Sequence, residues 1–165
     1  MSSIASFYLI DVSKLDELTQ HAEIIVKKTL FSKKTTDNYY DYLANNATPL
    51  KNFDASGHLY GNLLVFWDEE RKIDLLNNEY NAIANELTEK RDCSNFIFTH
   101  NQKIAFLQRL NPANYSVKEL QTFNADFSED GDEETAQYTL DAIRVFHDNL
   151  NEIQNDKQVM LLIVG

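Results

Sequence analysis

A run of acidic residues at positions 126–134 offers the clearest potential for chemistry in this sequence. A calcium-binding loop requires oxygen ligands at alternate positions and a glycine for its sharp turn. Half of that pattern is present, in Asp126, Ser128, Asp130 and Asp132, with Gly131 at the turn. The twelfth position, however, is Gln137, whose neutral amide cannot supply the bidentate carboxylate of such a loop. We therefore favour an acidic loop in which Asp130 or Asp132 caps the next helix, and we expect no metal and no other cofactor.

Histidine, cysteine and glycine residues form no recognisable catalytic motif. The four histidines show no HxH or HExxH spacing and no cluster with cysteine, which argues against a zinc site. With only four glycines, the sequence contains neither GxGxxG nor a P-loop. Cys93 and His100 flank an expected strand, but a nucleophile pair requires contact between the two side chains, and a free cysteine is usually a small buried residue. The sequence thus predicts no catalytic residue.

Aromatic and histidine side chains supply the remaining candidates, as parts of an interface or of a pocket. Three tyrosines at positions 39–42 cannot all face the core from one helix, and pairing Tyr39 with Leu43 on the inward face leaves Tyr40 or Tyr42 near the surface. Tyrosine suits partner surfaces because it combines an apolar ring with a polar tip, although such residues more often line the margin of a core. The alternative is a small-ligand pocket, which we place near His58, Trp67 and His100.

The elements expected to position these residues begin with two apolar runs at the ends of the sequence. The run Val159–Val164, rich in Val, Ile and Leu, is typical of a strand buried on both faces. A terminal segment frays unless something holds it, and the other long apolar run, Ile4–Val12, is its natural partner. We expect these two strands to pair with each other at the centre of the core.

Between these strands, apolar residues at spacings of three and four predict several helices. The stripe Leu15, Leu18, Ala22 and Ile25 predicts one helix from Ser13 to Lys28, followed by a basic, polar connection at 32–36. A second helix is expected from Thr36 or Asp37 to Pro49, because proline disfavours helical geometry in the residue before it. The segment His58–Trp67 fits a helix better than a strand, which is kept as the alternative.

The second half of the sequence alternates between helices and one further strand. Helices are expected at 78–90, 99–110, 117–123 and 133–155, and the middle strand at 95–99. Thr99 and Gln102 have the spacing of a capping box, which marks the start of the helix after that strand. Neither repeats nor linkers divide the chain, so we expect one α+β domain over residues 1–165. In it, a small sheet of N-terminal, middle and C-terminal strands packs against several helices.

The two ends of the sequence resemble a known family. The opening Ile4–Asp11, followed directly by a helix, and the ending Leu161–Gly165 after a long helix are similar to the YfbM-like family of uncharacterised bacterial proteins. The resemblance is concentrated in these ends, and the middle is less clearly alike. It implies a compact cytoplasmic α+β domain, and it brings no established activity and no catalytic residues.

Composition limits the compartment and the classes of partner. One cysteine cannot form an internal disulfide, the N-terminus lacks the features of a signal peptide, and no apolar segment approaches the ~18 residues of a membrane span. We therefore expect a cytoplasmic protein without a membrane partner. With 15 basic and 26 acidic residues the chain carries −11, which repels nucleic-acid phosphates and suits a basic protein partner.

Two functional hypotheses follow from these observations. The favoured one is a non-catalytic acidic module for protein interaction, of which an immunity-type antitoxin is an example, because charge and aromatic residues are plentiful and catalytic motifs are lacking. The alternative is a small-ligand-binding protein or an enzyme with an unrecognised pocket. Homodimerisation through a strand edge or the tyrosines is compatible with either hypothesis.

Overall fold

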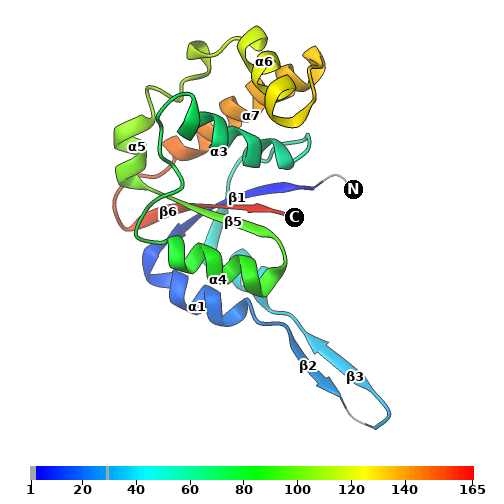
Figure 1. Ribbon diagram of the computed structural model, residues 1–165. Helices are drawn as coiled ribbons and strands as arrows, with labels where there is room; N and C mark the ends of the chain where they lie inside the picture. Colours follow the sequence, from blue (N-terminus) through cyan, green and yellow to red (C-terminus); the bar gives the residue numbers. More distant parts are fainter. Residues whose placement is uncertain (1–2, 29) are drawn as a thin grey trace.

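An antiparallel sheet with the strand order β4-β1-β6-β5 forms the centre of the protein. The computed structural model describes residues 3–28 and 30–165. The strands of the sheet are β1 (Ala5–Asp11), β4 (Ala47–Pro49), β5 (Ser94–Thr99) and β6 (Gln158–Val164). Figure 1 shows β6 between β1 and β5 in the middle of the molecule. A strand from each end of the chain therefore lies in the interior of the sheet.

The pairing of β1 with β6 confirms the sequence-based prediction. The two strands run antiparallel in a register from Ala5↔Val164 to Asp11↔Gln158. Beyond β1, the backbones of Ile4 and Gly165 exchange two more hydrogen bonds, with N···O distances of 2.8 and 3.1 Å. Every residue of β6 after Gln158 is buried, as expected for a strand covered on both faces.

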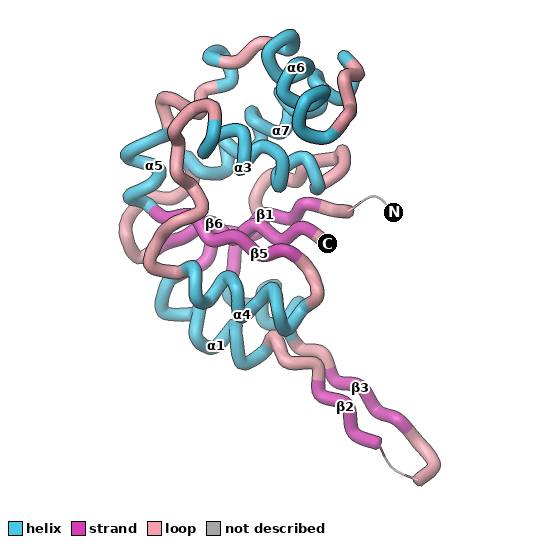
Figure 2. Tube along the Cα trace, in the orientation of Figure 1, coloured by secondary structure: helices cyan, strands magenta, loops and turns pink. Residues whose placement is uncertain are grey.

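Helices cover both faces of the sheet (Figure 2). One layer contains α1 (Leu15–His21), α2 (Tyr39–Asn46) and α4 (Asn81–Arg91). The other contains α3 (His58–Glu69), α5 (His100–Phe106), α6 (Val117–Ser128) and α7 (Glu133–Asn151). Short 3-10 turns, η1 (Val12–Lys14) and η2 (Pro112–Asn114), complete the helical elements of the described residues.

Alternate residues of β6 divide the hydrophobic core into two clusters. Met160 and Leu162 face the layer of α3 and α7, whereas Val159 and Leu161 face the layer of α1, α2 and α4. This alternation follows from the two-residue period of side chains along a strand. The predicted α+β class, with N-terminal, middle and C-terminal strands in one small sheet, is confirmed.

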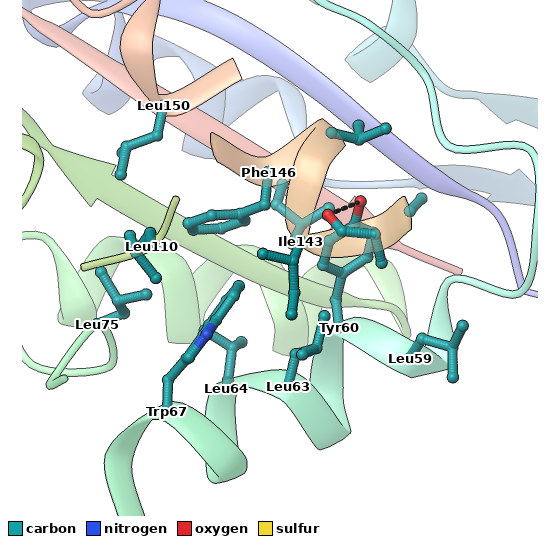
Figure 3. Close-up of a cluster of buried hydrophobic side chains, with 14 of the residues drawn as sticks. Leu59, Tyr60, Leu63, Leu64, Trp67, Leu75, Leu110, Ile143, Phe146 and Leu150 are labelled. Carbon is teal, nitrogen blue, oxygen red and sulfur yellow. Dashed lines mark hydrogen bonds between the residues drawn. The ribbon is translucent and has the colours of Figure 1, made fainter. Parts of the chain in front are cut away.

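Phe146 is the centre of the larger cluster (Figure 3). From α7 its ring contacts Trp67 and Phe98 at centroid distances of 4.9 Å each, and Phe7 and Tyr60 at 6.5 and 6.3 Å. The Tyr60 hydroxyl donates a hydrogen bond to the Ala142 carbonyl oxygen at 3.2 Å, so this polar group is satisfied inside the core. Burial raises the pKa of Tyr60 above its usual value, which keeps the hydroxyl protonated.

From residue 58 onward, the structure contains a helix wherever the sequence predicted one. His58–Trp67 is helical, within α3, and the strand alternative is wrong there. Thr99 and Gln102 form the predicted capping box at the start of α5. The boundaries differ: α6 extends beyond Phe123 to Ser128, and the long helix α7 ends at Asn151, before the expected Asn155.

The first half contains the main error. The helix predicted from Ser13 to Lys28 ends at His21, and a strand, β2 (Ile25–Lys28), follows it. The polar connection expected at 32–36 is largely a second strand, β3 (Lys33–Thr36), which pairs with β2. Three consecutive β-branched residues at 24–26 favour extended backbone over helix, and this preference prevails over the apolar stripe. The helix expected to reach Pro49 ends at Asn46, and residues 47–49 form the edge strand β4, where proline is tolerated.

Replacing Phe146 tests the packing of this core. Phe146→Ala should lower the free energy of unfolding by about 3–5 kcal/mol, because it leaves a cavity among the surrounding aromatic rings. Urea unfolding followed by circular dichroism measures the change. Phe127→Ala, at a ring that is 47% exposed, is the matched control and should change stability by less than about 1 kcal/mol. Equal losses in the two variants would contradict the packing described here.

Candidate protein interface

A β-hairpin projects from the α1–α4 side of the molecule (Figure 1). It is built from β2 and β3, and we call the described residues 24–28 and 30–36 the basic hairpin. Leu30 and Phe31 at its tip are 96% and 98% exposed, and Ile24, Ile25 and Val26 are about half exposed. Large exposed apolar side chains on a two-stranded ribbon are unfavourable in water and are typical of interaction surfaces, so we treat the hairpin as a candidate interface.

The lysines of the basic hairpin face one another across the two strands. Lys27 pairs with Lys34, and Lys28 pairs with Lys33. Because neighbours along a strand point to opposite faces, each face of the hairpin carries two positive charges. Like charges directly opposite each other destabilise a strand pair. The hairpin thus concentrates positive charge at the expense of its own stability.

Both ends of the basic hairpin are fixed to the last turn of α4. Asp37 follows β3 directly and makes a bidentate ion pair with Arg91, with N···O distances of 2.9 and 2.8 Å. On the other side, Glu23 precedes the hairpin and lies 3.8 Å from the Lys90 ammonium group. Hydrogen bonding from Arg91 holds the pKa of Asp37 below its usual value despite partial burial. The base of the hairpin is therefore held to α4, whereas the side chains of Leu30 and Phe31 at its tip are exposed.

A second feature lies between α3 and α6, at the end of the molecule opposite to the hairpin (Figure 1). It is a groove of about 460 Å³, which we call the acidic groove. Its carboxylates belong to Glu69, Glu70, Glu119 and Asp126, and its aromatic rings to Phe66, Phe123 and Phe127. Phe123 and Phe127 stack at 5.2 Å, one turn apart on α6. Negative charge and aromatic surface occur here together, as required for binding a cation or a basic side chain.

Three of the four carboxylates of the acidic groove lie where a helix disfavours them. Glu69 is in the last turn of α3, Glu70 caps its C-terminus, and Asp126 is in the last turn of α6. The helix dipole makes the C-terminal end negative, so acidic groups there are destabilising. Glu119 forms a 2.5 Å ion pair with Arg71, but no ion pair within the described residues involves the other three carboxylates. A basic partner would satisfy them.

Of the two tyrosines that the sequence offered as candidates for the surface, one is exposed and the other is buried. Tyr40 is 54% exposed and packs edge-on against Tyr39, close to the Arg91 guanidinium at the base of the hairpin. Tyr42 is buried, and its hydroxyl donates to the Glu17 carboxylate at 3.0 Å. Burial, with the hydrogen bond to Glu17, raises the pKa of Tyr42 to about 12. Tyr42 is therefore a packing residue, and only Tyr40 remains a candidate for the surface.

The structure does not bring His58, Trp67 and His100 into a common pocket. Trp67 is fully buried in the core against Phe146, because the inward stripe of α3 continues through it. His58 is exposed at the start of the same helix, and His100 begins α5. Cys93 and His100 lie at opposite ends of β5, so their side chains cannot form a nucleophile pair. The pocket interpretation of these residues is wrong.

The acidic run does not have the geometry of a calcium-binding loop. Asp126 and Ser128 belong to α6, and the Ser128 hydroxyl donates to the Asn124 carbonyl oxygen. Asp130 accepts hydrogen bonds from the Asp132 amide and the Thr135 hydroxyl, and Asp132 caps α7 by accepting from the Glu134 amide. Throughout the described residues, no group of three or more histidine, cysteine or acidic side chains is arranged to hold a metal ion. The run caps a helix.

A further cavity of about 720 Å³ lies between the segment 51–55 and α7. Its size falls in the range of small-molecule sites. Three of its four charged lining residues, however, already form ion pairs: Arg144 binds Asp141 at 2.6 Å, and Lys51 binds Asp148 at 3.4 Å. These groups do not converge on a common point, so the cavity shows no constellation for catalysis or ligand recognition.

Sequence reasoning missed both the basic hairpin and the acidic groove. The hairpin had a local signal, since residues 24–26 are β-branched and lysine pairs flank an apolar dipeptide. The groove had none, because α3 and α6 contribute residues that are about 50 positions apart. Only tertiary packing brings these carboxylates and aromatic rings together.

Comparison of the chain with protein-family models, curated proteins and solved structures found no match. The resemblance to the YfbM-like family therefore stays a prediction. In the part of the chain that the structure describes, no helix combines the length and the apolar character needed to cross a membrane. Functional inference accordingly rests on the two surfaces described above.

Asp37→Asn tests the base of the hairpin. The amide keeps the oxygen that accepts from the Tyr39 amide but removes the charge beside Arg91, whose side chain is only 6% exposed. We expect a loss of about 2 kcal/mol at neutral pH. Because the folded-state pKa of Asp37 is lowered, its contribution is complete above the ordinary aspartate pKa of about 3.9 and disappears as the pH falls through the folded-state value.

Urea unfolding at several pH values measures this effect. The difference between the wild type and Asp37→Asn should shrink below about pH 4. Asp148→Asn, which removes an exposed ion pair to Lys51, is the control and should cost less than about 1 kcal/mol. A difference that persists unchanged at acidic pH would show that the ion pair is not its source.

Proposed function

We propose that this protein is a non-catalytic protein-interaction module whose acidic groove binds a basic segment of a protein partner. The observation that carries the proposal is the position of Glu69, Glu70 and Asp126 at helix C-termini without an intramolecular ion pair. Carboxylates in such positions lower the stability of the fold, and they gain a favourable role only when a cation approaches them.

The aromatic rings of the groove support a peptide or protein as the occupant. Phe127 is 47% exposed beside Phe123, so the groove offers apolar contact together with negative charge. A lysine or arginine side chain has the matching structure, since its apolar stem ends in a cation. An immunity or antitoxin role, in which an acidic protein neutralises a basic one, would use this chemistry.

A small-ligand-binding protein or an enzyme is the second candidate. It would use the 720 Å³ cavity beside α7, whose volume suits a small molecule. We favour the groove because Glu69, Glu70 and Asp126 form no ion pair within the described residues, whereas Lys51, Asp141 and Arg144 at that cavity already form ion pairs.

Stability provides the first test of the proposal. Glu69→Gln/Glu70→Gln should raise the free energy of unfolding by about 1 kcal/mol, because it removes two negative charges from the C-terminal end of α3. Glu89→Gln/Glu152→Gln is the matched control: Glu89 lies in the last turn of α4 and Glu152 caps α7, both away from the groove. Both double variants should be stabilised similarly in thermal unfolding.

Binding of a defined probe separates the two variants. A synthetic peptide rich in lysine and arginine with one phenylalanine, titrated in a calorimeter, should bind the wild type and the control variant equally. Its affinity for Glu69→Gln/Glu70→Gln should fall roughly tenfold, which corresponds to about 1.4 kcal/mol. An equal loss in both variants would mean that the peptide responds only to net charge and would contradict a site in the groove.

A further inference from the structure

The basic hairpin and the acidic groove have complementary chemistry. The hairpin contains four lysines and no acidic residue, so the other 11 basic residues face all 26 acidic ones and the rest of the chain carries −15. The tip presents Leu30 and Phe31, both almost fully exposed, and the groove presents the half-exposed ring of Phe127. The two surfaces are opposite in charge, and each offers apolar side chains that the other can contact.

We propose that the basic hairpin of one chain docks into the acidic groove of a second copy. The inference rests on the proposed function, since it names the occupant of the groove. In the docked arrangement, Phe31 packs on the rings of Phe123 and Phe127. The hairpin lysines lie beside Glu69, Glu70 and Asp126 of the other copy.

The positions of the two surfaces require that the contact is between chains. The hairpin extends from the layer of α1 and α4, and α6 lies at the far end of the molecule (Figures 1 and 2). Ion pairs to Arg91 and Lys90 hold the base of the hairpin at α4, on the opposite side of the sheet from its own groove. Different patches of the two copies meet, which makes the assembly head-to-tail, growing into a ring or an open chain.

Both surfaces carry local destabilisation that this docking relieves. Opposed lysines repel each other within the hairpin, and carboxylates lie against the helix dipoles in the groove. Violations of local rules that have no internal compensation are expected at functional sites. An anionic membrane would account for the hairpin alone and would repel the −15 of the body, whereas a second copy accounts for both surfaces.

Two charge variants that should both fold provide the test. Lys27→Glu/Lys28→Glu converts each cross-strand lysine pair into a pair of opposite charges, which stabilises the hairpin while it abolishes its net charge. Glu69→Lys/Glu70→Lys replaces two of the four groove carboxylates with cations, which cancels the charge of the groove, and it places these cations where the helix dipole favours them. Circular dichroism and thermal unfolding verify that both variants are folded.

Sedimentation velocity on the full chain measures assembly at low ionic strength, about 0.01 M, where charges interact over ~30 Å. The wild type should form species larger than a monomer that dissociate as salt is added. Each charge variant alone should associate at least tenfold more weakly. An equimolar mixture should form dimers and nothing larger, because one intact hairpin and one intact groove remain between the two variants.

Other results would overturn the inference in distinguishable ways. A monomeric wild type, or variants that assemble as the wild type does, would exclude the hairpin–groove contact. If the wild type is monomeric but the basic peptide still requires Glu69 and Glu70, the groove binds a different protein and the proposed function stands. Sedimentation of the wild type with phosphatidylserine vesicles, lost in Lys27→Glu/Lys28→Glu, would assign the hairpin to a lipid surface instead.

Discussion

The pairing of β1 with β6 is the interaction on which the rest of the structure depends. Both strands are interior to the sheet, and β6 contributes alternate side chains to two separate hydrophobic clusters. Each helical layer therefore packs on the same strands, and neither layer has a core without them. Phe146 shows the result on one side, where rings from β1, α3 and β5 meet the centre of α7.

On this stable interior, the protein places two surfaces that lower its own stability. Lysines are opposed in the basic hairpin, and carboxylates crowd the ends of α3 and α6. Neither arrangement improves the packing of the core. Hydrophobic burial is strong enough to tolerate such small penalties, each of a few tenths of a kcal/mol to about 1 kcal/mol. These are the two surfaces through which we propose that the protein binds a partner.

The sequence was informative where one local preference was unopposed. Continuous apolar runs predicted β1 and β6, and the Thr99–Gln102 box predicted the start of α5, because both signals are contained within a few residues. Prediction failed at Ile25, which fits a helical stripe and an extended run equally well. The sequence left open whether Tyr40 or Tyr42 is exposed, and packing against distant residues decides that it is Tyr40. Prediction also failed for Trp67, whose burial depends on partners far away in the sequence, and for the acidic groove, which exists only after α3 and α6 pack.

The central position of β6 has a consequence for how the chain acquires its structure. Asp11 pairs with Gln158, so the sheet closes only when residues almost the whole sequence apart meet, which is entropically expensive and slow. During translation, β6 is the last described element to leave the ribosome. Until then, β1 and β5 have no strand between them, and the apolar stripes of α1, α4 and α7 lack their common support. Nascent chains of this protein therefore expose extensive apolar surface until β6 pairs with β1 and β5, and they are open to aggregation during that time.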